Sequence, residues 1–286
     1  MKKVNLSSGL SSYQIKLIAV FFMTLYNLAS YGGNLDFISN HSTLLCVLGQ
    51  TSGPLFLYML TESIRYTKNR RYFLVRLYLG AIGVGIFTSL TNLYTGHSVG
   101  IFRSDNVMFS YFYTALYIIS IEKIIKGFQE HCKRNILHGF IGILVTIIIH
   151  IIVVNIRPHI VDNMYSASWF DSILTSPMYV EYTPMFILLG ILMYFLNGRL
   201  QKAIAVLLFS LISSNYWLAD FCISTPISTF FNYPQRYMSL ALLFILLYNG
   251  TRGKEHKAFF YTYYPLHRYC IALIAFAIKK FALSFS

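Results

Sequence analysis

The stretch ILHGFIGILVTIIIHIIVV, residues 136–154, decides how the rest of the chain is interpreted. It contains no Asp, Glu, Lys or Arg, and it lacks the period-2 alternation that a strand of a membrane barrel needs. A helix rises about 1.5 Å per residue, so a run of this length can cross the ~30 Å hydrocarbon core of a bilayer. Residues 136–154 therefore predict a transmembrane helix.

Similar apolar runs recur along the whole chain. With 136–154 included, they lie at residues 15–31, 43–62, 74–93, 108–126, 136–154, 177–196, 202–219, 236–249 and 259–281. Hydrophobic residues make up 56% of the 286 residues and charged ones only 12%, which is too little charge for a water-facing surface of this size. The sequence predicts an all-α protein, a polytopic membrane helix bundle with about nine transmembrane helices. We expect residues 1–286 to form a single integral membrane domain.

The distribution of basic residues explains the formal net charge of +13. Lys and Arg collect in cytoplasmic loops of membrane proteins. An N-terminus in the cytoplasm places 17 of the 23 basic residues on the cytoplasmic side. The remaining six are Arg103, Arg157, Arg236, Arg268, Lys279 and Lys280. The charge therefore indicates topology and contact with lipid, and we expect no nucleic acid partner. Because Lys279 and Lys280 would end the last span on the outer side, the sequence does not decide on which side of the membrane the C-terminus lies.

The cysteines do not indicate a metal site or a disulfide framework. Cys46, Cys132, Cys222 and Cys270 are isolated, with no C-x-x-C pair. Cys132 and Cys222 also fall on opposite sides of the predicted membrane. We expect no bound metal.

Ionisable side chains inside membrane spans are costly, so they are functional candidates. His267 lies in AFFYTYYPLHRYC, residues 258–270, with Tyr263 and Tyr264 four and three residues before it on the same helix face. Pro265 frees a backbone carbonyl one turn earlier. A neutral imidazole beside tyrosines can accept and return a proton near neutral pH, which makes His267 and Tyr264 candidate catalytic residues. The alternative is an aromatic belt with a polar helix contact.

The other intramembrane ionisable residues have simpler interpretations. Glu62, Arg76 and Glu122 lie close to the predicted cytoplasmic edge, where they are expected to pair or to extend toward water. His150 has no polar neighbour in the sequence, and it is expected to be a hydrogen-bonded histidine in a helix contact.

Four stretches carry a family resemblance. They are LSSYQIKLIAVFFMTLYNLA (10–29), GPLFLYMLTESIRYTKNRRYFLVRL (53–77), SDNVMFSYFYTALYIISIE (104–122) and YNGTRGKEHKAFFYTYYPLH (248–267). In this order they resemble the TraX family of conjugation- and pilus-associated membrane proteins. The resemblance implies a bacterial plasma (inner) membrane protein with several membrane passes.

The resemblance also implies an activity. The best-known family member acetylates the N-terminal amine of a pilin, with acetyl-CoA as the donor. His267 matches the family's C-terminal histidine and is the expected base, with Tyr264 or Asn106 supporting the polarised carbonyl. The residues expected to hold the donor are Arg76, Asn249, Arg252 and Lys254. The expected acceptor is a pilin or another surface peptide. Acetylation of a surface glycan, or a catalytically degenerate protein of pilus assembly, secretion or immunity, is the alternative.

The chain departs from the family pattern in its first helix. Relatives usually carry an Asp-His pair after a methionine, whereas MTLYN places Tyr26 and Asn27 there. Tyr and Asn form hydrogen bonds but cannot act as a base at neutral pH. If that pair is catalytic in relatives, this chain is inactive, altered in substrate, or dependent on His267 alone.

Overall fold

The computed structural model describes residues 9–32, 36–95, 106–161, 164–213, 234–254 and 257–283. Within these ranges the fold is helical, which confirms the all-α class. The chain divides into two compact units, and we describe each by itself. The terminal unit comprises residues 1–59 and 195–286, and the central unit comprises residues 60–194. The single domain expected for residues 1–286 stays a prediction.

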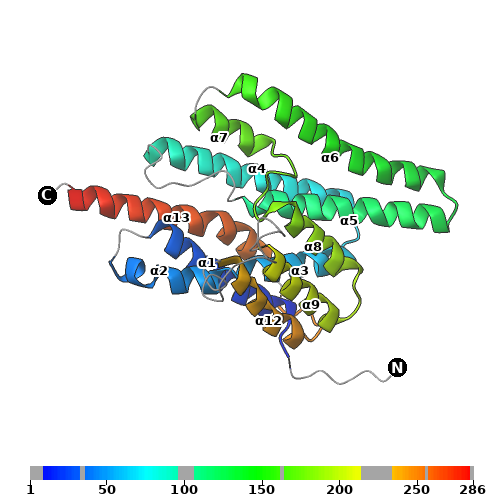
Figure 1. The fold of residues 1–286 in the computed structure, drawn as a ribbon, viewed down its shortest axis with the longest axis horizontal. Coiled ribbons are helices and arrows are strands. Elements are labelled where there is room, and N and C mark those ends of the chain that lie inside the picture. The colour runs from blue at the N-terminus through cyan, green and yellow to red at the C-terminus, as the bar shows by residue number, and fades with distance from the viewer. Residues whose placement is uncertain are drawn as a thin grey trace, which may run out of the picture. The chain divides into compact units, whose positions relative to one another are not determined.

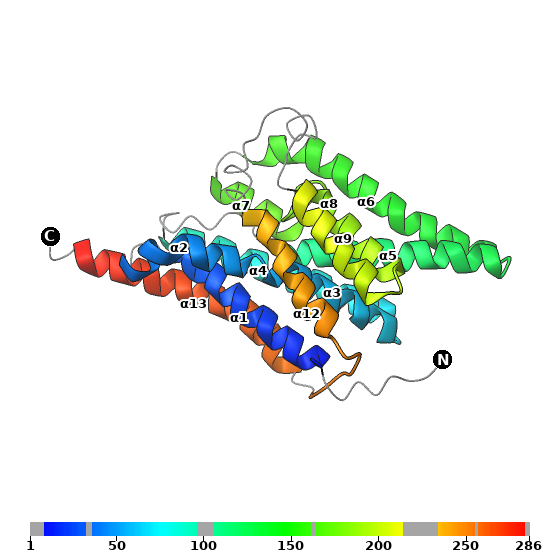
Figure 2. The ribbon, with the colours of Figure 1, turned by 60° about the horizontal axis from the view of Figure 1, so that its bottom comes forward.

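The terminal unit contains both ends of the chain. Its elements are α1 (Ser12–Tyr31), α2 (Asp36–Gly49), the first half of α3 (Ser52–Tyr66), α9 (Arg199–Ile212), the 3₁₀ helix η2 (Pro234–Leu240), α12 (Ala241–Leu247) and α13 (Lys257–Leu283). Helix α1 lies beside α13, and α12 lies beside α9 (Figure 2). Helix α1 begins at a capping box, in which Ser11 and Gln14 each accept from the other's backbone N–H.

Helices α1 and α13 run in the same direction. Tyr13 near the start of α1 packs edge-on against Phe260, with ring centroids 6.0 Å apart. Further along both helices, Nδ2 of Asn27 lies 2.7 Å from Nε2 of His267. If both helices cross the membrane, their C-terminal ends lie on the same side.

The central unit holds the second half of α3 and four long or medium helices. These are α4 (Arg70–Thr95), α5 (Val107–Gln129), α6 (Lys133–Ile160) and α8 (Thr183–Phe195), with the short α7 (Met164–Ile173) between the last two. Helices α5 and α6 form an antiparallel hairpin, and α7 lies along α4 (Figure 1). A Cβ added at Gly139 would lie 2.6 Å from the carbonyl oxygen of Ser120, so this hairpin needs a glycine for close packing.

The predicted spans agree with the helices in position. Among the described residues, four stretches are long and apolar enough to cross a membrane: Ile38–Tyr66, Arg70–Thr95, Val107–Gln129 and Lys133–Ile160. Two shorter apolar helices, Pro184–Phe195 and Gln235–Leu247, coincide with predicted spans as well. The chain is thus a multi-pass membrane protein by composition and helix length, whereas the number nine stays a prediction. Residues 214–219 of the predicted span 202–219 lie outside the described residues.

Two predicted segments differ from the structure. The span at 43–62 is interrupted by Gln50 and Thr51, between α2 and α3. The segment between the predicted spans 136–154 and 177–196 contains the end of α6 and all of α7, and non-helical residues 174–182 follow. Apolar runs reveal how long a segment is but not where its helix breaks.

Side chains of the central unit compensate for the break between α7 and α8. Tyr78 donates to the carbonyl oxygen of Ile173 (2.9 Å), Tyr113 to that of Thr175 (2.5 Å) and Ser110 to that of Glu181 (2.9 Å). Backbone carbonyls outside a helix lack the partners that a helix provides, so donors from side chains take their place. Side chains of the central unit therefore stabilise the conformation of the break.

Polar contacts of the central unit also settle three expectations. Glu122 pairs with Arg70, and Glu62 pairs with Arg65 at 3.7 Å, as predicted for carboxylates near the cytoplasmic edge. His150 shares a hydrogen bond of 2.8 Å with Ser176, which confirms a hydrogen-bonded packing histidine. Its partner comes from the break and was not visible in the neighbouring sequence.

Candidate functional site

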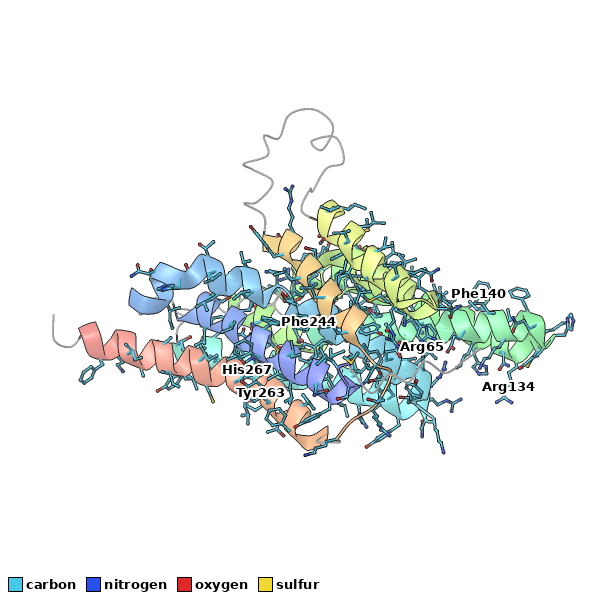
Figure 3. The ribbon with its side chains drawn as sticks, turned by 90° about the horizontal axis from the view of Figure 1, so that it is seen from below. Arg65, Arg134, Phe140, Phe244, Tyr263 and His267 are labelled. Carbon is cyan, nitrogen blue, oxygen red and sulfur yellow. The ribbon has the colours of Figure 1, made fainter. Side chains whose placement is uncertain are left out.

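His267 is buried between α13 and α1, with 8% of its surface exposed. The side-chain amide of Asn27 donates from Nδ2 to its Nε2 at 2.7 Å. Its Nδ1 lies 2.7 Å from the carbonyl oxygen of Tyr263, one turn earlier on α13. Figure 3 shows His267 and Tyr263 next to each other along this helix. Both ring nitrogens therefore have partners.

The partners determine the protonation of the ring. A carbonyl oxygen only accepts, so Nδ1 of His267 must carry the hydrogen. Asn27 donates from the same Nδ2 to the carbonyl oxygen of Met23 at 3.1 Å, which fixes the orientation of its amide. Its second hydrogen then points at Nε2, which must be the accepting nitrogen. His267 is thus a neutral imidazole whose basic lone pair faces a neutral amide.

Tyrosines surround the imidazole, as the sequence predicts. The ring of Tyr263 stacks on that of His267, with centroids 4.8 Å apart and planes 5° from parallel. Its hydroxyl shares a 2.8 Å hydrogen bond with Thr24 of α1. Tyr264 lies further away, at 6.3 Å between centroids and with a tilt of 58°. Of the two tyrosines, Tyr263 lies closer to His267 than Tyr264, the candidate from the sequence, and a catalytic role for Tyr264 stays a prediction.

Asn27 is the residue that sequence reasoning did not place in the site. It appeared there only as a departure from the family pattern, yet it is the direct partner of His267 and is itself buried, with 7% exposed. The departure from the family pattern could have indicated this, because the resemblance places a candidate catalytic pair of relatives at these positions. The next residue after His267 is also buried: the Arg268 guanidinium lies 5.7 Å from the ring centre of Tyr31.

The glycine-containing loop before α13 binds the start of α1. Backbone N–H groups of Ser12 and Tyr13 donate to the carbonyl oxygens of Thr251 (2.9 Å) and Arg252 (3.3 Å). These are N–H groups at the helix start that lack partners within the helix. The loop thus caps α1 with backbone atoms.

Two residues of this loop have clear conformational roles. Asn249 donates to the carbonyl oxygen of Gly9 (3.0 Å) and accepts from the backbone of Thr251 (2.9 Å). Gly253 has a φ of +69°, and a Cβ there would lie 2.7 Å from the hydroxyl of Ser11. Close approach to α1 explains this glycine.

The expected donor-binding residues are distributed over both units. Arg252 and Lys254 are exposed on the loop of the terminal unit. Arg76 belongs to α4 of the central unit, with its guanidinium 5.7 Å from the ring centre of Tyr72. The structure brings Asn249, Arg252 and Lys254 together in one loop, whereas Arg76 falls in the other unit and their joint role stays a prediction.

Asn106, the expected carbonyl-supporting residue, also lies in the central unit. Its side chain caps α5 by accepting from the backbone N–H of Met108 (3.3 Å), and it donates to the carbonyl oxygen of Ala81 (2.9 Å). Such contacts are typical of a structural N-cap. A catalytic role for Asn106 stays a prediction.

Comparison with known proteins settles the family. A model of the TraX protein family matches residues 11–275. The chain belongs to the TraX family. The match confirms the resemblance carried by the four motifs and associates this TraX chain with conjugation and pili. No curated protein and no solved structure matches it.

The site of this TraX chain offers acid-base chemistry without a metal ligand set. Among the described residues, no group of three His, Cys, Asp or Glu side chains could hold a metal ion. His267 is neutral, buried and held by groups that hydrogen-bond without carrying charge. A neutral imidazole in this state can take up one proton at Nε2 once the Asn27 amide moves away.

Proposed function

We propose that this TraX chain is a membrane acetyltransferase that transfers the acetyl group of acetyl-CoA to an amine. The acceptor proposed is the N-terminal amine of a pilin or another surface peptide. The observation that carries the proposal is the accepting lone pair of His267 at Nε2, in a buried side chain and hydrogen-bonded to the neutral amide of Asn27. Membership of the TraX family supports the choice of reaction.

The proposed reaction is acyl transfer with His267 as general base. The amine nitrogen attacks the thioester carbonyl carbon, the C–N bond forms and the C–S bond breaks. Nε2 of His267 takes the proton that the amine loses, and the departing sulfur of coenzyme A receives it. Because Nδ1–H stays bonded to the carbonyl oxygen of Tyr263, the ring keeps its orientation while it carries the proton.

The exposed cations of the loop suit the donor. Acetyl-CoA carries phosphates, and arginine binds phosphate with two parallel hydrogen bonds while lysine acts as a point charge. Arg252 and Lys254 are exposed directly before α13, the helix that carries His267. We propose that these two side chains hold the donor.

The test is acetyl transfer by the full chain in nanodiscs, measured as release of coenzyme A thiol in the presence of a peptide with a free N-terminal amine. His267→Ala should abolish the transfer at unchanged abundance in the membrane. His150→Ala is the matched control, since it removes a hydrogen-bonded histidine from the central unit and should retain the activity. Retained transfer in His267→Ala would rule out the proposed role of this residue.

A second candidate is a non-catalytic TraX protein that acts in pilus assembly, secretion or immunity through helix contacts. The observation that favours it is that both ring nitrogens of His267 already have partners. The double variant Tyr26→Asp with Asn27→His separates the two candidates. Gain of transfer in that variant over an inactive parent would identify a lapsed enzyme, whereas His267-dependent transfer by the unaltered chain would exclude the second candidate.

A further inference from the structure

We propose that Thr24 of α1 is a positioning residue for His267 and that it acts through the side chain of Tyr263. This inference rests on the function proposed above and names a residue that orients its general base. Two hydrogen bonds of Thr24, the stacked rings on α13 and the direction of the Nε2 lone pair support it.

The hydroxyl of Thr24 has two partners. It donates to the carbonyl oxygen of Val20, one turn earlier on α1, at 2.9 Å. It also lies 2.8 Å from the hydroxyl of Tyr263 on α13. A carbonyl oxygen only accepts, so the single hydroxyl hydrogen of Thr24 goes to Val20, and the hydroxyl of Tyr263 donates to Thr24. The end of the Tyr263 side chain is therefore tied to α1.

One face of α1 contacts both members of the stacked pair on α13. Thr24 and Asn27 are three positions apart, and Tyr263 and His267 are four apart, so each pair shares a helix face. Thr24 meets Tyr263 at 2.8 Å, and Asn27 meets His267 at 2.7 Å. The contact between the two hydroxyls is thus about one helical turn from the contact that covers Nε2.

The ring of Tyr263 sets the plane of the imidazole. It lies 5° from parallel to the ring of His267, with centroids 4.8 Å apart. The lone pair of Nε2 lies in the plane of the imidazole, so a turn of the ring would change its direction. Tyr264 is tilted by 58° at a centroid distance of 6.3 Å and does not stack in this way. Of these two tyrosines, Tyr263 is therefore the one that orients the lone pair.

The stack matters most when the base is used. In the structure, Asn27 at Nε2 and the carbonyl oxygen of Tyr263 at Nδ1 hold the imidazole at both nitrogens. Nε2 has to release the Asn27 amide before it can take up a proton. The one hydrogen bond that then remains, at Nδ1, leaves the ring free to tilt, whereas a parallel ring on its face opposes the tilt. Because Thr24 holds that parallel ring, it preserves the direction of the base during the attack.

The kinetic experiment separates positioning from binding. Thr24→Val removes the hydroxyl and keeps the shape of the side chain, and it is assayed for acetyl transfer as the full chain in nanodiscs. We expect kcat to fall about tenfold at an unchanged KM for the peptide, because a misdirected base slows the chemistry and leaves binding intact. Thr24→Ser keeps the hydroxyl and should restore most of kcat.

A double-mutant cycle tests whether Thr24 acts through Tyr263. Tyr263→Phe removes the other hydroxyl of the same hydrogen bond and should also lower kcat about tenfold. The double variant Thr24→Val with Tyr263→Phe should be no slower than either single variant, because all three lack the same bond. Thr114→Val is the matched control. It removes a buried hydroxyl of the central unit that donates to the carbonyl oxygen of Ser110 (2.8 Å), as Thr24 does to Val20, and should leave kcat unchanged.

Nitrogen-15 NMR of the histidine-labelled chain reports the state of the imidazole without any reaction. His267→Asn identifies the signals of His267 by their loss. In the unaltered chain we expect one set of signals, with Nδ1 protonated and Nε2 unprotonated. Thr24→Val should broaden or split them, since the ring then samples more than one orientation, and Thr114→Val should not.

Three outcomes overturn the inference. They are an unchanged kcat and an unchanged His267 signal in Thr24→Val, a loss in the double variant equal to the product of the two single losses, and an equal loss of kcat in Thr114→Val. Failure of the proposed function differs from these. A changed His267 signal in Thr24→Val without any transfer by the unaltered chain defeats the proposed function alone, whereas His267-dependent transfer with an unchanged kcat in Thr24→Val defeats this inference alone.

Discussion

The two units hold their buried polar groups in different ways. In the central unit, Arg157 binds Asp171 through two hydrogen bonds of 3.0 and 3.1 Å. In the terminal unit, the described side chains include no Asp or Glu, and buried contacts such as Asn27 with His267 join neutral groups. Breaking a buried ion pair strands a charge, whereas a neutral hydrogen bond can be exchanged for one to a ligand. Removing one member of such a buried pair should therefore cost more stability in the central unit than in the terminal unit.

The largest expected effect tests the central unit. Asp171 is buried, with 5% of its side chain exposed, and Asp171→Ala would leave the Arg157 guanidinium, whose side chain is 26% exposed, without its carboxylate. Because two hydrogen bonds between charged groups are lost, we expect a loss of about 3 kcal/mol in the free energy of unfolding. Unfolding in nanodiscs, followed by the fluorescence of Trp169 on α7, measures this loss.

Two control variants sharpen that result. Glu62→Ala breaks a longer and more exposed pair with Arg65 and should cost below about 1 kcal/mol. The double variant Asp171→Leu with Arg157→Leu removes both charges and should recover much of the stability lost in Asp171→Ala. A loss in Asp171→Ala no larger than that in Glu62→Ala would contradict the view that the central unit depends on its buried charges.

The next effect tests the contact between the loop before α13 and the start of α1. Gly253→Ala combines a strained left-handed φ with a Cβ forced against Ser11, and it should cost about 2–3 kcal/mol. Gly250 has a similar φ of +81° but open space around it, so Gly250→Ala should cost only about 1 kcal/mol. Hydrogen exchange at the first turn of α1 measures whether the hydrogen bonds between this loop and α1 have weakened. Equal exchange in both variants would argue against the contact with α1.

A smaller effect tests the neutral pair at the site. Asn27→Leu removes the donors to Nε2 of His267 and to the carbonyl oxygen of Met23, and it should cost about 1–2 kcal/mol. Asn155→Leu, an exposed asparagine with one bond to its own helix, is the control and should change the stability little. The comparison between units fails if Asn27→Leu costs as much as Asp171→Ala.

The smallest effect concerns the break between α7 and α8. Tyr78→Phe removes one donor from the carbonyl oxygen of Ile173 and should cost about 1 kcal/mol. Hydrogen exchange should rise in residues 173–182 and stay unchanged in α6. Tyr66→Phe, at an exposed position, should alter neither quantity. Hydrogen exchange that rises evenly over the central unit would show that Tyr78 stabilises the whole unit and not only the break.

The sequence by itself determined the local features of this protein. Apolar runs predicted the helical class and the positions of the spans, because helix length and side-chain hydropathy follow from neighbouring residues. The motifs identified the TraX family and selected His267. The carboxylates near the predicted cytoplasmic edge, Glu62 and Glu122, were expected to pair, and the structure bears this out.

Only the tertiary structure decided which groups meet. Asn27 and His267 are 240 positions apart, and no local sequence pattern predicts that the Asn27 amide donates to Nε2 of His267. The interruption at Gln50 and Thr51 was likewise hidden, because an apolar run does not reveal a break whose polar atoms are buried by another helix. The function of His267 depends on such distant contacts, since the state of an imidazole is set by what its two nitrogens bind and not by its place in the sequence.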